Sequence, residues 1–130
     1  YPIVLKNANG ERELSFTAIE ETQCPTNHAI VGSMLAQSWW LPEEICLAIR
    51  HHHDYATLGQ REGATVVPAA SLGLIATAQF SEHLLQHHTG LSKTQEWDKA
   101  GTVCLELLKI DDKDMQAIYE ESAFVIANDI

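Results

Sequence analysis

Hydrophobic residues recur at helical spacing over most of the chain, whereas the alternating pattern of β-strands is almost absent. Polar turns and breakers divide this pattern into about six segments, and several begin with a proline, which suits the first turn of a helix. Residues 2–5 are expected to be extended, and residues 54–63 are expected to form a polar loop. The sequence therefore predicts an all-α fold with a single domain over residues 1–130. The predicted helices cover residues 11–22, 25–39, 42–53, 68–88, 94–108 and 112–128.

The predicted helix over residues 25–39 has a histidine at one end of its apolar side. Val31, Leu35 and Trp39 are spaced to lie on one side of this helix, which we expect to face the core. His28 lies three residues before Val31 and therefore extends the same side by one turn. The simplest alternative for His28 is a hydrogen-bonded core residue without a function.

The next predicted helix, over residues 42–53, ends with two further histidines on its apolar side. Two isoleucines define that side, and His52 and His53 follow at the next turn. We expect their side chains to converge with that of His28, close enough to share one metal ion or water. The alternative is that they only stabilise the negative end of the helix dipole.

The long predicted helix over residues 68–88 carries polar residues in line with its apolar face. Gln79 follows Ile75 on the inward side, and His83 follows one turn later. His83 and His87 have the i, i+4 spacing of a helical metal site. They lie near a helix end that is expected to be exposed, so we expect no metal there.

The charge of the chain excludes several classes of partner. Eight Lys and Arg residues stand against 18 Asp and Glu residues, for a formal net charge of −10, and nucleic acids or anionic membranes need a basic surface. No apolar run is long enough to cross a bilayer. Three cysteines without a C-x-x-C pair indicate a reducing cytoplasm. Glu20 and its acidic neighbours are expected to be solvated surface groups.

Four pieces of sequence follow one another in a specific order within residues 20–54. They are Glu20, His28-Ala29-Ile30-Val31-Gly32, Trp39-Trp40-Leu41-Pro42-Glu43-Glu44-Ile45 and Ala48-Ile49-Arg50-His51-His52-His53-Asp54. In this order and spacing they resemble the HDOD (HD-related output) domain, a bacterial signalling branch of the HD-domain metal phosphohydrolase superfamily. Residues 65–85 also resemble the next helix of that family.

The resemblance implies a helical bundle like that of the HD-domain phosphodiesterases, in which histidines and aspartates from several helices line a metal pocket. In catalytic relatives such as the HD-GYP phosphodiesterases, metal ligands stand at the positions of His28, His52 and His53. Further candidates for the lining of the pocket are Asp54, Gln79 and His83.

The chain also departs from the catalytic members of the superfamily. Its only His-Asp dipeptide, His53-Asp54, belongs to the histidine-pair motif, so the signature dipeptide is missing. Gln79 stands where the resemblance calls for an aspartate ligand, and an amide lacks the negative charge expected at a hydrolytic metal centre. Residues 55–59 replace the catalytic Gly-Tyr-Pro signature. No cofactor is expected beyond weak binding of a divalent cation such as zinc, nickel, iron or manganese.

These features favour a non-catalytic signalling or regulatory module that acts through contacts with other signalling proteins. Two alternatives stay open. One is a metal-dependent phosphohydrolase or cyclic-dinucleotide phosphodiesterase whose remaining ligands lie outside this chain. The other is a domain that holds a nucleotide in the pocket without cleaving it.

The resemblance further implies helices before Tyr1 that cover one side of residues 18–53. Without such helices, apolar residues on that side are expected to be partly uncovered, among them Ile30, Met34 and Cys46. We expect the chain to close this face by forming a homodimer.

Overall fold

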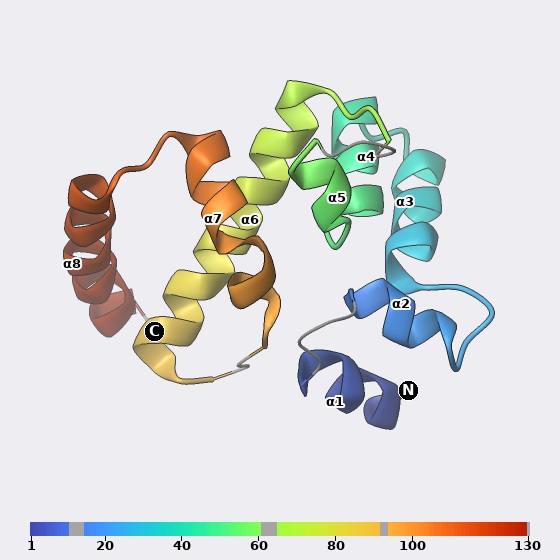
Figure 1. Ribbon diagram of the computed structural model, residues 1–130, viewed down its shortest axis with the longest axis horizontal. Coiled ribbons are helices and arrows are strands. Elements are labelled where there is room, and N and C mark those ends of the chain that lie inside the picture. The colour runs from blue at the N-terminus through green and yellow to red at the C-terminus, as the bar shows by residue number, and fades with distance from the viewer. Residues whose placement is uncertain (11–14, 61–64, 92–93, 130) are drawn as a thin grey trace.

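The computed structural model describes residues 1–10, 15–60, 65–91 and 94–129, and within these ranges the chain forms helices and turns but no β-strand. This confirms the all-α prediction. The long helix α6 lies at the centre, with α4, α7 and α8 packed against it, α3 against α4, and α1 against α2 (Figure 1). The helices are α1 (Pro2–Gly10), α2 (Phe16–Glu21), α3 (His28–Ser38), α4 (Glu43–His51), α5 (Tyr55–Leu58), α6 (Ala69–Thr89), α7 (Glu96–Leu108) and α8 (Asp112–Asp129).

The main hydrophobic core lies where α4, α5, α6 and α7 meet. Leu58 of α5, Leu72 and Ile75 of α6, and Cys104 of α7 are almost completely buried in it. Gln79 lies one turn beyond Ile75 and is buried as well. The inward face predicted for the long helix is therefore confirmed.

Two segments that were expected to be irregular are helical. The first is α1, which replaces the expected extended segment because Val4 and Ala8, four residues apart, are buried on the same side of a helix. The second is α5, a single turn inside the expected polar loop. The Asp54 carboxylate caps it by accepting a hydrogen bond from the backbone N–H of Thr57 at 3.1 Å.

The side of α3 that faces the protein is not the one predicted. Val31, Leu35 and Trp39, which were expected to face the core, are exposed. The buried side consists of two alanines and Ser33. The prediction was wrong because it assumed that the largest apolar side chains face inward.

Close contact between α3 and α4 explains this orientation. A Cβ atom at Gly32 would lie only 3.1 Å from Cγ2 of Ile49, and the Ser33 hydroxyl donates a hydrogen bond to the backbone carbonyl of Cys46 at 3.0 Å. Only small side chains fit between helices at such a separation. The large apolar residues of α3 are therefore directed away from α4.

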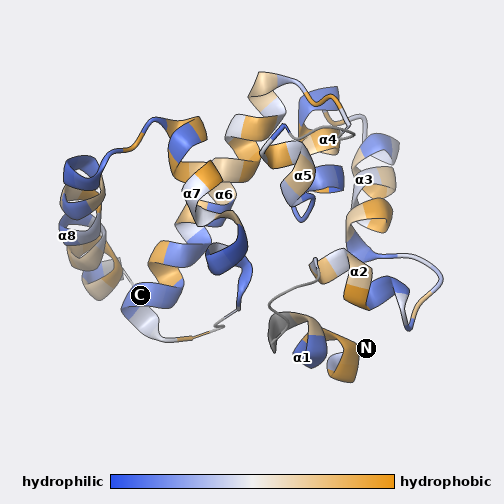
Figure 2. Cartoon of the chain, in the orientation of Figure 1, coloured by the Kyte–Doolittle hydropathy of each residue, from blue (hydrophilic) through white to orange (hydrophobic). Residues whose placement is uncertain are grey.

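Exposed apolar residues are frequent on the outer helices. Figure 2 shows hydrophobic residues, coloured orange, on both α3 and α4. Of the residues expected to be uncovered, Met34 is exposed and Ile30 is half-buried. Cys46 is buried, because α3 covers it, so the expectation was wrong there. Within the described part of the chain, no helix combines the length and the apolar character needed to cross a membrane.

Two helical glycines provide a matched test of this packing. A Cβ at Gly101 would lie 2.8 Å from the Trp97 ring, which stacks on Phe80 and His83, whereas a Cβ at Gly73 would meet nothing within 4 Å. Gly73→Ala should raise the free energy of unfolding by about 0.5–1 kcal/mol through helix propensity. Gly101→Ala should lower it by roughly 1–2 kcal/mol because the ring must move. Urea denaturation measures the free energy of unfolding of both variants. Equal changes in the two would contradict the close contact of Gly101 with the Trp97 ring.

Candidate functional site

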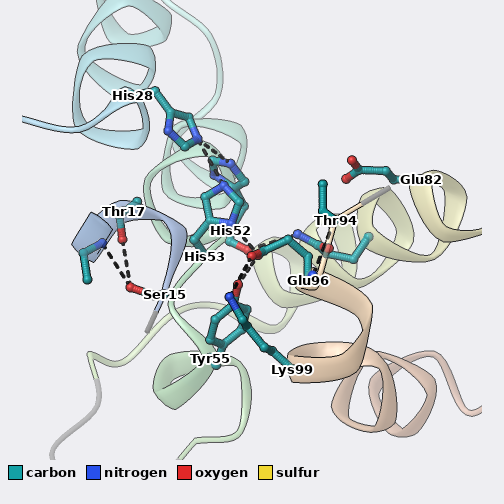
Figure 3. A network of polar contacts seen from close by, with 12 residues as sticks. Ser15, Thr17, His28, His52, His53, Tyr55, Glu82, Thr94, Glu96 and Lys99 are labelled. Carbon is teal, nitrogen blue, oxygen red and sulfur yellow. Dashed lines mark hydrogen bonds and ion pairs between the residues drawn. The ribbon is translucent and has the colours of Figure 1, made fainter. Parts of the chain in front are cut away.

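Three histidines from two packed helices meet in one pocket. Nε2 of His28 lies 3.0 Å from Nε2 of His52 and 3.1 Å from Nε2 of His53. One nitrogen from each residue falls within a group of atoms no more than 4.8 Å apart. Figure 3 shows the three rings directed toward one another. The convergence expected from the sequence is confirmed.

Helix ends place these rings. His28 is the first residue of α3, whose first turn is fixed by Asn27: the side-chain oxygen of Asn27 accepts a hydrogen bond from the N–H of Ile30 at 2.9 Å. His52 caps the C-terminus of α4, and His53 follows it. Because α3 and α4 pack tightly, the start of one helix lies beside the end of the other.

Each ring is held at its other nitrogen by a hydrogen-bond acceptor. Nδ1 of His28 lies 2.5 Å from a carboxylate oxygen of Glu20, and Nδ1 of His53 lies 2.7 Å from one of Glu96. Nδ1 of His52 lies 2.7 Å from the backbone carbonyl of Ile49. Carboxylates and carbonyls only accept hydrogen bonds, so the hydrogen of each ring belongs on Nδ1. In the neutral rings, the lone pairs of the three Nε2 atoms then face one another.

Facing lone pairs repel each other unless a cation lies between them. The donor set, three imidazoles with hydrogen-bonded Nδ1 atoms, is one that zinc prefers. Two zinc-bound nitrogens at about 2.0–2.1 Å in tetrahedral geometry are about 3.3 Å apart, close to the separations of His28 from the other two rings. The residues present therefore could hold one borderline divalent cation, with His28, His52 and His53 as its ligands.

Glu20 is a buried carboxylate, with only 1% of its surface exposed. Burial alone would raise the pKa of Glu20, but hydrogen bonds from the Tyr1 hydroxyl and from the backbone and ring of His28 outweigh it and hold this pKa below its usual value. The same contact with Glu20 raises the pKa of Tyr1 to about 12. The expectation that Glu20 is a solvated surface group was wrong, because His28 and the start of α1 cover it.

Glu96 plays the same part on the other side of the pocket, and sequence reasoning missed it. It is the first residue of α7, 4% exposed, and it accepts hydrogen bonds from His53 and from the hydroxyl of Tyr55. Burial opposes its ionisation, but these bonds and Lys99, 3.5 Å away, keep the pKa of Glu96 below its usual value. Burial, followed by the hydrogen bond to Glu96, raises the pKa of Tyr55.

The pocket around the histidines is small, and among the described residues that line it the imidazoles are the only basic side chains. It encloses about 340 Å³. Burial, followed by the nearby His53, lowers the pKa of His52 to about 4, so His52 is neutral at physiological pH and can act as a ligand. The Gln79 amide donates to the backbone carbonyl of His52 at 3.3 Å. The lining residues are Tyr1, Leu5, Phe16, His28, His52, His53, Gln79, Glu82, Thr94 and Glu96.

The other two candidate residues lie outside this pocket. The carboxylate of Asp54 caps α5 and also accepts a hydrogen bond from the hydroxyl of Thr57 at 2.7 Å. His83 lies on α6 and stacks on Trp97, with ring centroids 4.2 Å apart. Nε2 of His83 lies 2.5 Å from the hydroxyl of Tyr119 on α8. His83 therefore contributes to the packing of α6, α7 and α8.

One comparison with known proteins bears on this arrangement. The family model of the HDOD domain matches residues 2–55. This part of the chain is HDOD-like. The match confirms the resemblance and extends over α1 to α4, including Glu20 and the three histidines but neither Gln79 nor Glu96. HDOD domains belong to the HD-like superfamily. No curated protein and no solved structure matches the chain.

The role of Glu96 in holding His53 can be tested by removing its charge. Glu96→Gln keeps the shape of the side chain but weakens two hydrogen bonds to a buried carboxylate, so the free energy of unfolding should fall by about 2 kcal/mol. Glu82→Gln is the matched control, because Glu82 lines the same pocket but is exposed and accepts a hydrogen bond from Gln86. Denaturant titration compares the two variants. A loss as small for Glu96→Gln as for the control would show that Glu96 does not hold His53.

Proposed function

We propose that the chain is a non-catalytic signalling or regulatory module of the HDOD type, acting through protein contacts, with a histidine pocket that no longer serves phosphoester hydrolysis. The observation that carries this proposal is the lining of the pocket. Within the described residues, no Lys or Arg lines it, and two glutamates do. A phosphate ester carries negative charge, which needs cationic groups around it.

The roles of the acidic groups support the same conclusion. Glu20 and Glu96 bind the Nδ1 atoms, on the side of each ring that faces away from the shared point. Gln79 is neutral, whereas the resemblance calls for an aspartate at this place. Neither Glu20 nor Glu96 is therefore arranged to bridge two metal ions, as two-metal hydrolysis requires.

A single divalent cation of the zinc or nickel type suits the pocket better than the sequence indicated. Glu20 and Glu96 orient His28 and His53 and raise the basicity of the rings, as carboxylates behind metal-binding histidines do. Such an ion, held by the three histidines, would supply Lewis acidity and would tie α3 to the end of α4. We assign it a structural or regulatory role.

A cytoplasmic location fits the three free cysteines.

The runner-up is metal-dependent hydrolysis, and the three-histidine geometry is the observation that favours it. A zinc ion bound by three histidines can activate water near neutral pH. Catalysis would additionally require a group that neutralises the phosphate, which the described lining does not supply. The two functions therefore differ in turnover, although both predict a bound ion.

A combined binding and activity assay separates them. After treatment with a chelator, added zinc should raise the melting temperature of the chain. At a zinc concentration 100 times the dissociation constant, binding should add about 2.7 kcal/mol to the free energy of unfolding. His52→Ala should abolish this rise, whereas His87→Ala, on the exposed end of α6, should retain it.

The same preparations should not hydrolyse a cyclic dinucleotide or p-nitrophenyl phosphate with Zn²⁺, Mn²⁺, Fe²⁺ or Mg²⁺. Metal-dependent turnover that His52→Ala removes and His87→Ala retains would overturn the proposal in favour of hydrolysis. Absence of both turnover and zinc stabilisation would leave the signalling role standing without a metal.

A further inference from the structure

An uncharged apolar surface covers the outside of α3 and α4. We call it the α3–α4 face. It begins on α3, passes through the turn after this helix and reaches the first turn of α4, all of it exposed. Its residues are Val31, Met34, Leu35, Trp39, Trp40 and Ile45.

The size of this face is unusual for a surface that faces only water. Trp40 is 93% exposed, and Trp39 and Met34 are about two-thirds exposed. From their exposed fractions, the six residues together expose on the order of 800 Å², backbone included, whereas the largest apolar patch of a typical monomer is about 300–600 Å². About 800 Å² per partner is the size of a standard stable protein interface. The area available is therefore what one dimer contact needs.

Trp40 protrudes from this face in a backbone conformation that no side-chain packing within the described part of the monomer stabilises. Its φ of 60° lies in the left-handed region, which favours glycine and is unfavourable for a bulky side chain. The backbone N–H of Trp40 is bonded to the carbonyl of Gln37 at 3.0 Å, but its ring lies almost entirely in solvent. A contact outside the monomer would explain why a tryptophan occupies this position.

A groove that can receive such a ring begins at the edge of the same face. It lies between α4 and α6, has a volume of about 420 Å³ and is mainly apolar. Ile45 belongs both to the face and to the groove, and Leu74 forms part of the opposite wall. At its far end the groove reaches His52 and Gln79, which also line the histidine pocket.

From these features we infer that the α3–α4 face binds a second copy of this chain about a two-fold axis, with Trp40 of each copy in the groove of the other. A two-fold contact requires the protrusion and its receptor on one surface, and Ile45 joins them here. The six residues carry no charge although the chain carries −10, so the contact would bury no charged side chain of the face itself. The inserted ring would cover the groove beside His52.

The inference goes beyond the proposed function and does not depend on metal binding. The 130-residue chain should sediment as a dimer in the upper part of a dilution series from about 1 µM to about 1 mM. Glu43 and Glu44 lie exposed next to the face. Added salt should therefore tighten the dimer by screening their mutual repulsion.

Two variants on the face test the contact itself. Trp40→Gly should raise the dissociation constant at least about tenfold, as for the loss of a central aromatic anchor. It should leave the monomer as stable as before or more so, because glycine accepts the left-handed backbone. Leu35→Glu should abolish the dimer. Phe124→Glu, at an apolar residue of α8 that is more exposed than Leu35, is the control and should leave the dimer unchanged.

Three results would overturn the inference. The first is a chain that stays monomeric over the whole dilution series. This holds even if the monomer binds a different protein through the α3–α4 face. The second is a dimer that Trp40→Gly leaves unchanged. The third is a dimer that Phe124→Glu disrupts as strongly as Leu35→Glu, which would move the contact to α8.

Discussion

Three imidazole rings share one pocket because an acceptor holds each of them from behind. Glu20, Glu96 and the carbonyl of Ile49 take the Nδ1 hydrogens, which leaves the Nε2 atoms to face a common point. These acceptors come from α2, α4 and α7, so one set of hydrogen bonds joins helices that are distant in the sequence. The carboxylates keep their negative charge in a buried place because hydrogen bonds lower their pKa values. The fold and the site therefore depend on the same bonds.

The close packing of α3 on α4 links this pocket to the outer surface. Small residues on the inner side of α3 bring His28 next to the end of α4, and the same rotation turns Val31 and Leu35 outward. The α3–α4 face is thus a consequence of the geometry that assembles the histidines. The groove beside this face ends at His52, which also lines the histidine pocket. Binding of a second copy and binding of an ion would therefore act on the same residue.

Much of the fold could be predicted from sequence, and the parts that could not have physical reasons. Helical periodicity predicted α6 and its buried row. The convergence of the histidines was predicted correctly, but for His28 it was argued from a side of α3 that is exposed. Periodicity could not tell which side of α3 faces inward, because hydrophobicity favours large residues whereas close helix contact requires small ones. Glu96 was missed because it lies 43 residues after His53, and an acid in the first turn of a helix is most often a surface group.

The tautomer of the three histidines tests this account most directly. Long-range ¹H–¹⁵N NMR of the chain at neutral pH distinguishes a ring with its hydrogen on Nδ1 from one with it on Nε2. The account predicts a hydrogen on Nδ1 of His28, His52 and His53, both before and after zinc is added, because each Nδ1 faces an acceptor. A ring of His28 or His53 without a hydrogen on Nδ1 would show that Glu20 or Glu96 does not hold it, and would contradict the account.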